Sequence, residues 1–149
     1  MDFVTFLLKA KLNTYATDGE GNELNLDDGT HEMSCREGDF SYRDRYFGFN
    51  PFVGEEVVWG NDKVIWAMNY YGAVTDESIP GKDVYHFLQK AMQRVTVERP
   101  FRGPGECLEG DFVYHDQSEG GVDSFSGEEA IHFQGRRVYC LKYHGGKVG

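Results

Sequence analysis

Hydrophobic side chains recur at helical spacing in two places along the chain. Apolar residues stand at positions i, i+3, i+4 and i+7 in each segment, which is the spacing of one face of a helix. The pattern predicts amphipathic helices over residues 2–13 and 81–97, and Pro100 favours the end of the second one. The apolar positions are Phe3, Phe6, Leu7 and Ala10 in the first segment, and Val84, Phe87, Leu88 and Ala91 in the second.

After each helix, apolar and polar side chains alternate in short runs, which is typical of strands with one buried face. Turns at Asn61-Asp62 and Gln134-Gly135 predict that the last two strands of each set form a hairpin. The Gly-, Asn- and Asp-rich stretch 17–32 predicts a mobile loop or lid. The predicted strands are 40–47, 55–59 and 64–71 after the first helix, and 112–117, 128–132 and 137–144 after the second.

The two helix-and-strand units resemble one another in sequence. CREGDFSYRD, from Cys35, and CLEGDFVYHD, from Cys107, share seven of ten residues, and FVGEE and FSGEE follow them. The helix segments FLLKAK and FLQKAM also match. This order of matches predicts an internal duplication within a single domain, 1–149, with repeat one at 1–74 and repeat two at 82–148.

The fold class predicted from these elements is α+β. Each repeat would contribute one helix and three strands, so that the chain would contain two α-β-β-β units. The two units would form one antiparallel sheet, or two facing sheets, related by a pseudo-twofold axis. A chain of 149 residues is long enough to bury one hydrophobic core.

The register of the two hairpins decides which side chains share a face. The turn at Asn61-Asp62 implies that Trp59 faces Val64 and that Val57 faces Trp66, so one face of each hairpin is aromatic and carries a glutamate. We expect the helices to pack on the other, aliphatic face and the two aromatic faces to line a ligand cleft between the repeats. The predicted ligand-binding residues are Glu55, Trp59, Trp66, Tyr70, Glu128, His132, Tyr139 and Tyr143.

These residues also have a structural interpretation. Tryptophans in a hairpin are often core residues, the two glutamates could be solvated strand ends, and a register slip of one residue would exchange the faces. Tyr42 and Tyr114 are interpreted as packing residues with hydrogen-bonded hydroxyl groups. If Glu55 and Glu128 lay close together, their carboxyl groups could act as the acid/base pair of an enzyme.

The charge and cysteine content restrict the partners that we expect. The net charge is −10, from 15 basic and 25 acidic residues, and phosphate backbones repel such a surface, so we expect no direct nucleic-acid binding. No apolar run approaches the ~20 residues of a membrane helix, so we expect no membrane association. Cys35, Cys107 and Cys140 are few and odd in number, which argues against a disulfide framework and favours a cytoplasmic location.

Motifs that identify a chemistry are not found in the sequence. The five histidines do not combine with cysteines at the spacing of a zinc site, and His31 with Cys35 is a weak pair. The sequence contains no Gly-rich phosphate loop and no nucleophile elbow. We therefore predict no metal and no cofactor, and the sequence assigns no enzymatic reaction.

Several sequence blocks carry a family resemblance. REGDFSYRDRYFG, FVGEEVVW, VIWAMNYYGAV and VYCLKYHGG resemble a bacterial and archaeal domain family of unknown function that occurs alone or C-terminal to helix-turn-helix domains. This resemblance implies a sensor or effector role, although no helix-turn-helix segment is recognised in the sequence. The duplicated layout is also similar in outline to the effector-binding domains of gyrase-inhibitor-like regulators, which implies an aromatic cleft with an acidic residue for cationic ligands.

Three classes of function follow from these patterns. We expect a small ligand-binding or sensor module whose aromatic, acidic cleft takes a cationic or aromatic ligand. The first alternative is an enzyme that uses the paired glutamates in the same cleft. The second is a protein-interaction or dimerisation module, in which a partner, such as a second copy in a homodimer, covers the aromatic face.

Overall fold

A computed structural model describes residues 1–14 and 23–149 of the chain. In these two ranges most residues lie in strands, and the helices are short. The elements in chain order are α1 (Phe3–Asn13), β1 (Leu24–Asn25), β2 (His31–Glu37), β3 (Phe40–Gly48), β4 (Phe52–Gly60), β5 (Lys63–Val74), α2 (Gly81–Met92), β6 (Glu106–Glu109), β7 (Phe112–Gly121), β8 (Ser124–Phe133) and β9 (Arg136–Lys147).

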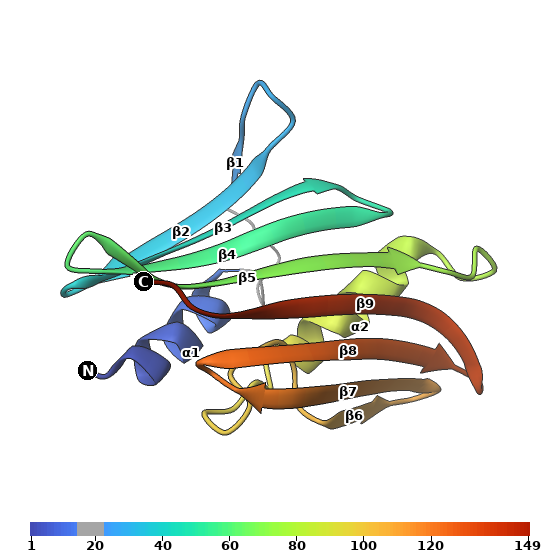
Figure 1. Cartoon of the computed structure of the whole chain (residues 1–149). Coiled ribbons are helices and arrows are strands. Elements are labelled where there is room, and N and C mark those ends of the chain that lie inside the picture. The colour runs from blue at the N-terminus through green and yellow to red at the C-terminus, as the bar shows by residue number, and fades with distance from the viewer. Residues whose placement is uncertain (15–22) are drawn as a thin grey trace.

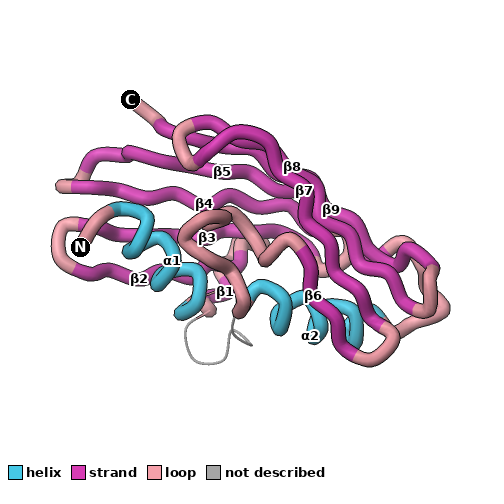
Figure 2. The backbone as a smooth tube through the Cα atoms, turned by 90° about the horizontal axis from the view of Figure 1, so that it is seen from below, coloured by secondary structure: helices cyan, strands magenta, loops and turns pink. Residues whose placement is uncertain are grey.

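All of these strands belong to one antiparallel sheet of nine strands, in the order β1-β2-β3-β4-β5-β9-β8-β7-β6 (Figure 1). Strands joined by a hairpin are also neighbours in space. The long connection through α2 leads from β5 to β6 at the far edge of the sheet, and the chain then returns through β7 and β8 so that β9 pairs with β5. The sheet therefore has a first half, β1–β5, and a second half, β6–β9, which meet along the β5–β9 pair. Both helices lie on the same side of this sheet (Figure 2).

The predicted α+β class is wrong, because a single antiparallel sheet contains most of the described residues and the two helices are short. The predicted α-β-β-β unit is wrong as well. β2 and β6 add a strand to each half that the sequence did not indicate, since their short segments lack a clear alternation of apolar and polar residues. Antiparallel pairing is confirmed throughout. Of the predicted loop 17–32, residues 17–22 lie outside the described residues, and the rest includes β1 and the start of β2.

The helices cover the sheet with the apolar side that the sequence predicts. α1 begins after Asp2, whose carboxylate accepts a hydrogen bond from the backbone nitrogen of Thr5 at 2.9 Å and so caps the helix. α2 ends at Met92, earlier than the predicted residue 97. The apolar positions that are fully buried are Phe6, Leu7 and Ala10 in α1, and Val84, Phe87, Leu88 and Ala91 in α2.

The register of the first hairpin contains a β-bulge. Trp59 lies opposite Val64, as predicted. Trp66, however, lies opposite Val58 and not opposite Val57. Ile65 is therefore an extra residue in β5, and the strand shifts by one position relative to its neighbour. The β8–β9 hairpin has the same irregularity, with Val138 as the extra residue of β9. A shift of one residue exchanges the two faces of a strand.

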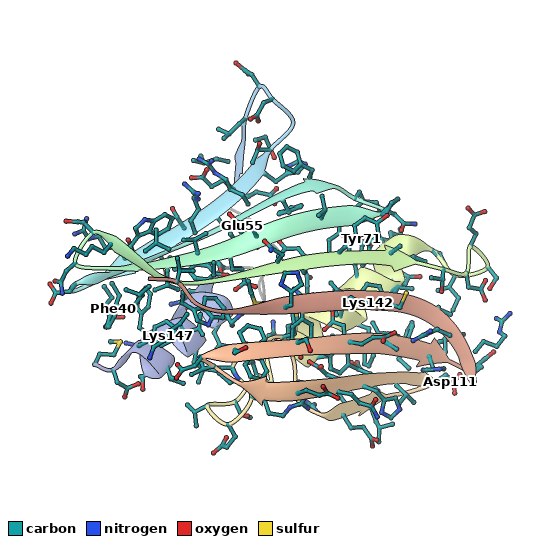
Figure 3. The ribbon with its side chains drawn as sticks, viewed as in Figure 1. Phe40, Glu55, Tyr71, Asp111, Lys142 and Lys147 are labelled. Carbon is teal, nitrogen blue, oxygen red and sulfur yellow. The ribbon has the colours of Figure 1, made fainter. Side chains whose placement is uncertain are left out.

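The exchange reverses the predicted environment of the glutamates. Glu56 and Glu129 point toward the helices and are fully buried, whereas Glu55 and Glu128 are exposed. Figure 3 shows Glu55 on the open side of the sheet, away from the helices. The face that carries the aromatic rings is the face that the helices cover, so the predicted aliphatic contact surface for the helices was wrong.

Candidate functional site

Two pairs of carboxyl groups lie in the interior between the sheet and the helices. Asp44 of β3 stands directly opposite Glu56 of β4, and Asp116 of β7 stands directly opposite Glu129 of β8. Their exposed fractions are 2%, 0%, 4% and 0% in that order. Buried carboxylates are stable only when hydrogen bonds or cations compensate their lost hydration, so the partners of these four groups define the site.

Glu56 is compensated by a lysine from α1. Lys11 Nζ lies 2.7 Å from Glu56 Oε1 and also donates to the carbonyl oxygen of Phe101 at 2.6 Å. The Tyr42 hydroxyl donates to the same Oε1 at 2.6 Å. Burial lowers the pKa of Lys11, and the negative charge of Glu56 opposes that effect. Glu56 Oε2 is buried without a hydrogen-bond partner among the described residues.

Glu129 is compensated by an arginine that follows α2. Arg102 lies 2.8 Å from Glu129 Oε1, and the Tyr139 hydroxyl donates to the same oxygen at 2.6 Å. The Tyr114 hydroxyl donates to Glu129 Oε2 at 2.6 Å. Tyr42 and Tyr114 are thus buried with hydrogen-bonded hydroxyl groups, as predicted.

Asp116 has a cation of its own. The Tyr143 hydroxyl donates to Asp116 Oδ1 at 2.8 Å, and the guanidinium of Arg99 lies 3.5 Å from the same oxygen. Arg99 also donates to the backbone carbonyl of Asp116 at 2.9 Å and to Ser118 Oγ at 3.2 Å. Burial, and then the negative charge of Glu129, raise the pKa of Asp116 to about 6.

Asp44 differs from the other three carboxyl groups. The Tyr70 hydroxyl donates to Asp44 Oδ1 at 2.5 Å, but no lysine or arginine among the described residues forms an ion pair with Asp44. Burial is the main reason that the pKa of Asp44 is raised to about 7, and the charge of Glu56 adds to it. The hydrogen bond from Tyr70 and the positive charges of Arg102 and Lys11 lower this pKa but do not outweigh the burial. Near neutral pH the carboxyl group of Asp44 therefore exists in both protonation states.

Glycines allow the two tyrosines to reach their aspartates. A Cβ atom at Gly54 would lie 2.3 Å from Cζ of Tyr70, and one at Gly127 would lie 2.1 Å from Cζ of Tyr143. No real side chain tolerates such distances, so each tyrosine ring lies directly over a strand at the glycine of a Gly-Glu-Glu sequence. The shared sequence blocks therefore build the same local arrangement in both halves of the sheet, with Tyr-x-Asp on one strand and Gly-Glu-Glu on the next.

Asp44 lines a cavity of about 210 Å³ between the first half of the sheet and α2. The Tyr46 hydroxyl donates to Glu23 at its wall. Tyr85 of α2 donates to the carbonyl oxygen of Phe49 at 2.6 Å and so ties the helix to the β3–β4 connection. Arg102 also borders the cavity. The wall is mainly apolar, and its rings are those of Tyr46, Phe49, Phe52, Tyr70 and Tyr85.

The charges of the buried network do not balance. The buried network contains four carboxyl groups, those of Asp44, Glu56, Asp116 and Glu129, and the described part of the chain supplies three cations to it from Lys11, Arg99 and Arg102. With all seven groups ionised, the network carries one unit of excess negative charge. A proton on Asp44 or a cation in the cavity would neutralise it.

Comparison with known protein families decides where the chain belongs. The family model described as a domain of unknown function, DUF5680, matches residues 44–148, which is more than two thirds of the chain. The chain is a member of the DUF5680 family. No curated protein and no solved structure matches it.

The family match tests the resemblance predicted from the sequence, and its bounds show which residues of the buried network it includes. Membership of a family of unknown function is confirmed, whereas its bacterial and archaeal range and its association with helix-turn-helix domains stay predictions. The part matched to DUF5680 begins at Asp44 and includes Glu56, Arg102 and Glu129, whereas Lys11 lies outside it.

The aromatic residues predicted to line a cleft have different environments. Trp66 and Tyr139 are 1% and 0% exposed, and the Trp66 indole donates to the carbonyl oxygen of Val122 at 3.0 Å. Tyr143 is buried and donates to Asp116. Of the aromatic residues predicted to bind a ligand, Tyr70 lines the cavity beside α2. Trp59 stacks on Arg43 with 5.1 Å between the guanidinium carbon and the ring centre. Most of these rings are therefore core residues, and the predicted ligand cleft between the two hairpins stays a prediction.

The predicted polar residues lie on the open face of the sheet. Glu128 forms an exposed ion pair with Arg137 at 3.2 Å, and Glu55 is exposed. The rings of His132 and His115 are 6.2 Å apart. No group of three metal-ligating side chains occurs in the described ranges, where the three cysteines are free. Within the same ranges, no helix is long and apolar enough to cross a membrane.

Sequence reasoning missed Asp44, Glu56, Lys11 and Arg102. The carboxyl groups had a detectable signal, because Tyr-x-Asp and Gly-Glu-Glu both occur twice. The two cations had none, since they stand in segments that pack on the sheet from a distance in sequence.

Proposed function

We propose that this protein is a small-ligand-binding module whose cavity beside α2 takes a molecule with a positive charge on an apolar body. The observation that carries the proposal is the Asp44 carboxyl group, which borders the cavity without an ion-pair partner among the described residues. The proposal keeps the ligand class expected from the sequence and moves the site from the two hairpins to the space between the first half of the sheet and α2.

The composition of the cavity supports a cation over an anion. Asp44 and Glu23 supply negative charge, and the aromatic walls attract a cation by ~0.5–2 kcal/mol for each well-placed ring when water is excluded. Arg102 opposes a cation, but its own charge is compensated by Glu129 at 2.8 Å. A cavity of about 210 Å³ suits one ring with a small polar group, since a cavity of ~150 Å³ takes benzene.

Calorimetric titration with single-ring cations tests this function. Benzylamine, benzylguanidine and benzyltrimethylammonium are compared with neutral benzyl alcohol at pH 8, where Asp44 is mostly ionised. We expect at least one cation to bind better than the alcohol, and Asp44→Asn to weaken its binding by about tenfold or more, which is ~1.4 kcal/mol. Glu55→Gln, on the open face, is the matched control and should leave binding unchanged. Equal binding of the cations to wild type and Asp44→Asn would contradict the proposal.

An enzyme is a second candidate, and the raised pKa of Asp44 is the observation that favours it. A carboxyl group with a pKa of about 7 can accept and release protons at neutral pH, and it lies in a cavity that could hold a substrate. Generic ester, phosphoester and glycoside substrates should then be turned over with a rate that changes near pH 7. Activity that persists in Asp44→Asn would rule out this role.

A further inference from the structure

The chain contains two versions of one Asp–Tyr arrangement, and only one of them adjoins the cavity beside α2. In both, a tyrosine hydroxyl donates to Oδ1 of an aspartate, at 2.5 Å for Tyr70 and Asp44 and at 2.8 Å for Tyr143 and Asp116. In both, the ring crosses the glycine of a Gly-Glu-Glu sequence. The two sites can therefore be compared group by group within one molecule.

The two arrangements differ in the cation that faces the aspartate. In the second half of the sheet, the guanidinium of Arg99 lies 3.5 Å from Asp116 Oδ1. It also donates to the Asp116 carbonyl oxygen and to Ser118 Oγ, at 2.9 and 3.2 Å. In the first half, Arg102 lies over the Tyr70 ring, with 5.2 Å between the guanidinium carbon and the ring centre. No described lysine or arginine forms an ion pair with Asp44, whose carboxyl group borders the cavity beside α2.

The groups that face Asp44 from the surrounding elements leave room for a similar cation. Tyr70 of β5 and Glu56 of β4 flank the carboxyl group, while Lys11 of α1 is held by Glu56 and Arg102 by Glu129. α2 contributes the uncharged side chains of Tyr85, Leu88, Gln89 and Met92 to the cavity wall. The carboxyl group is thus set among partners that are already engaged, at the wall of the cavity.

Resting on the proposed function, we infer that the ligand of this cavity presents a guanidinium or amidinium group to Asp44, as Arg99 does to Asp116. A planar cation of this kind offers several N–H donors in one plane, is more weakly hydrated than an ammonium group, and stacks on aromatic rings. A guanidinium is therefore a better partner than a compact ammonium for a carboxylate beside aromatic rings. Arg99 serves as the example, within the same chain, of how such a group meets an aspartate held by a tyrosine.

Calorimetric titration of wild type at pH 8 with benzylguanidine and benzylamine tests the inference, with benzyl alcohol as the neutral control. We expect benzylguanidine to bind about tenfold more tightly than benzylamine, because paired charge-assisted hydrogen bonds are stronger than a single one. Benzylamine binding as tightly as benzylguanidine would overturn the guanidinium inference and leave the proposed function intact. If neither cation bound better than the alcohol, the proposed function itself would fail.

Chemical rescue of the second half provides an independent readout. Arg99→Ala removes the partly exposed guanidinium from Asp116, and millimolar methylguanidine should raise the melting temperature of this variant more than it raises that of wild type. Methylamine at the same concentration should have a smaller effect. Equal effects of the two compounds on Arg99→Ala would remove Arg99 as the example and so contradict the inference. If this variant does not fold, the titration of wild type decides alone.

Discussion

Replacing Asp44 by asparagine should change how the stability of the protein depends on pH. Asparagine has nearly the same shape but cannot ionise, so the variant isolates the proton of Asp44. The folded protein holds this proton up to a pKa of about 7, whereas the unfolded chain releases it near the ordinary value of 3.8. Wild type should therefore lose stability relative to Asp44→Asn as the pH rises from 5 to 8.

The size of the effect follows from the two pKa values. One pKa unit corresponds to ~1.4 kcal/mol. At pH 5 the unfolded chain has already released most of the proton while the folded protein keeps it, and at pH 8 neither state holds it. Between these two pH values the difference in unfolding free energy between wild type and Asp44→Asn should change by about 2–3 kcal/mol, in the direction that favours wild type at low pH.

Urea unfolding at pH 5, 6, 7 and 8 measures this difference directly. Asp116, whose pKa is raised to about 6, also makes both proteins pH-dependent, but its contribution is common to them and cancels in the comparison. Glu55→Gln, which alters an exposed carboxylate, should show the wild-type profile. A difference between wild type and Asp44→Asn that stays constant within ~0.5 kcal/mol across the range would refute the raised pKa of Asp44.

Three further substitutions test the packing and the ion pairs by urea unfolding at pH 7. Gly127→Ala places a Cβ 2.1 Å from the ring of Tyr143 and should cost ~2–4 kcal/mol, whereas Gly121→Ala, which meets nothing within 4 Å, should change stability by less than ~0.5 kcal/mol; similar losses for both would contradict the ring-over-glycine geometry. Glu129→Gln leaves the guanidinium beside it buried without its carboxylate and should cost ~3–5 kcal/mol, against less than ~1 kcal/mol for the exposed Glu128→Gln; equal costs would show that the buried ion pair does not contribute as argued. Lys11→Met leaves the buried Glu56 without its cation and should cost ~3–5 kcal/mol, and a neutral outcome would mean that this carboxyl group is not charged in the folded protein.

The sequence predicts the local elements well, because they depend on local patterns. Helical spacing located α1 and the start of α2, and the turns at Asn61-Asp62 and Gln134-Gly135 located both hairpins. It did not predict β2 and β6, whose segments carry charged residues beside single buried side chains such as Met33 and Cys107. The internal duplication stays a prediction.

The site was harder to predict, because a single extra residue in β5 determines which glutamate lies on the buried face of the sheet. Val64, Ile65 and Trp66 are all apolar, so alternation cannot indicate which of them forms the bulge. Without that bulge, Glu55 rather than Glu56 would share a face with Trp66, which is the error that the sequence analysis made. The cations that compensate the glutamates depend on how separate segments dock on the sheet, and no local pattern encodes that docking.

The Lys11–Glu56 ion pair has a consequence for the minimal folding unit. A fragment cut to the residues that match DUF5680 would keep Glu56 but lose its counterion, along with β2 and the first part of β3. Such a truncated polypeptide would expose the apolar surface of the sheet that α1 covers, and it would retain the Glu56 carboxylate without its lysine partner. The autonomous unit in this protein therefore extends N-terminal to the matched boundary, at least as far as the first helix.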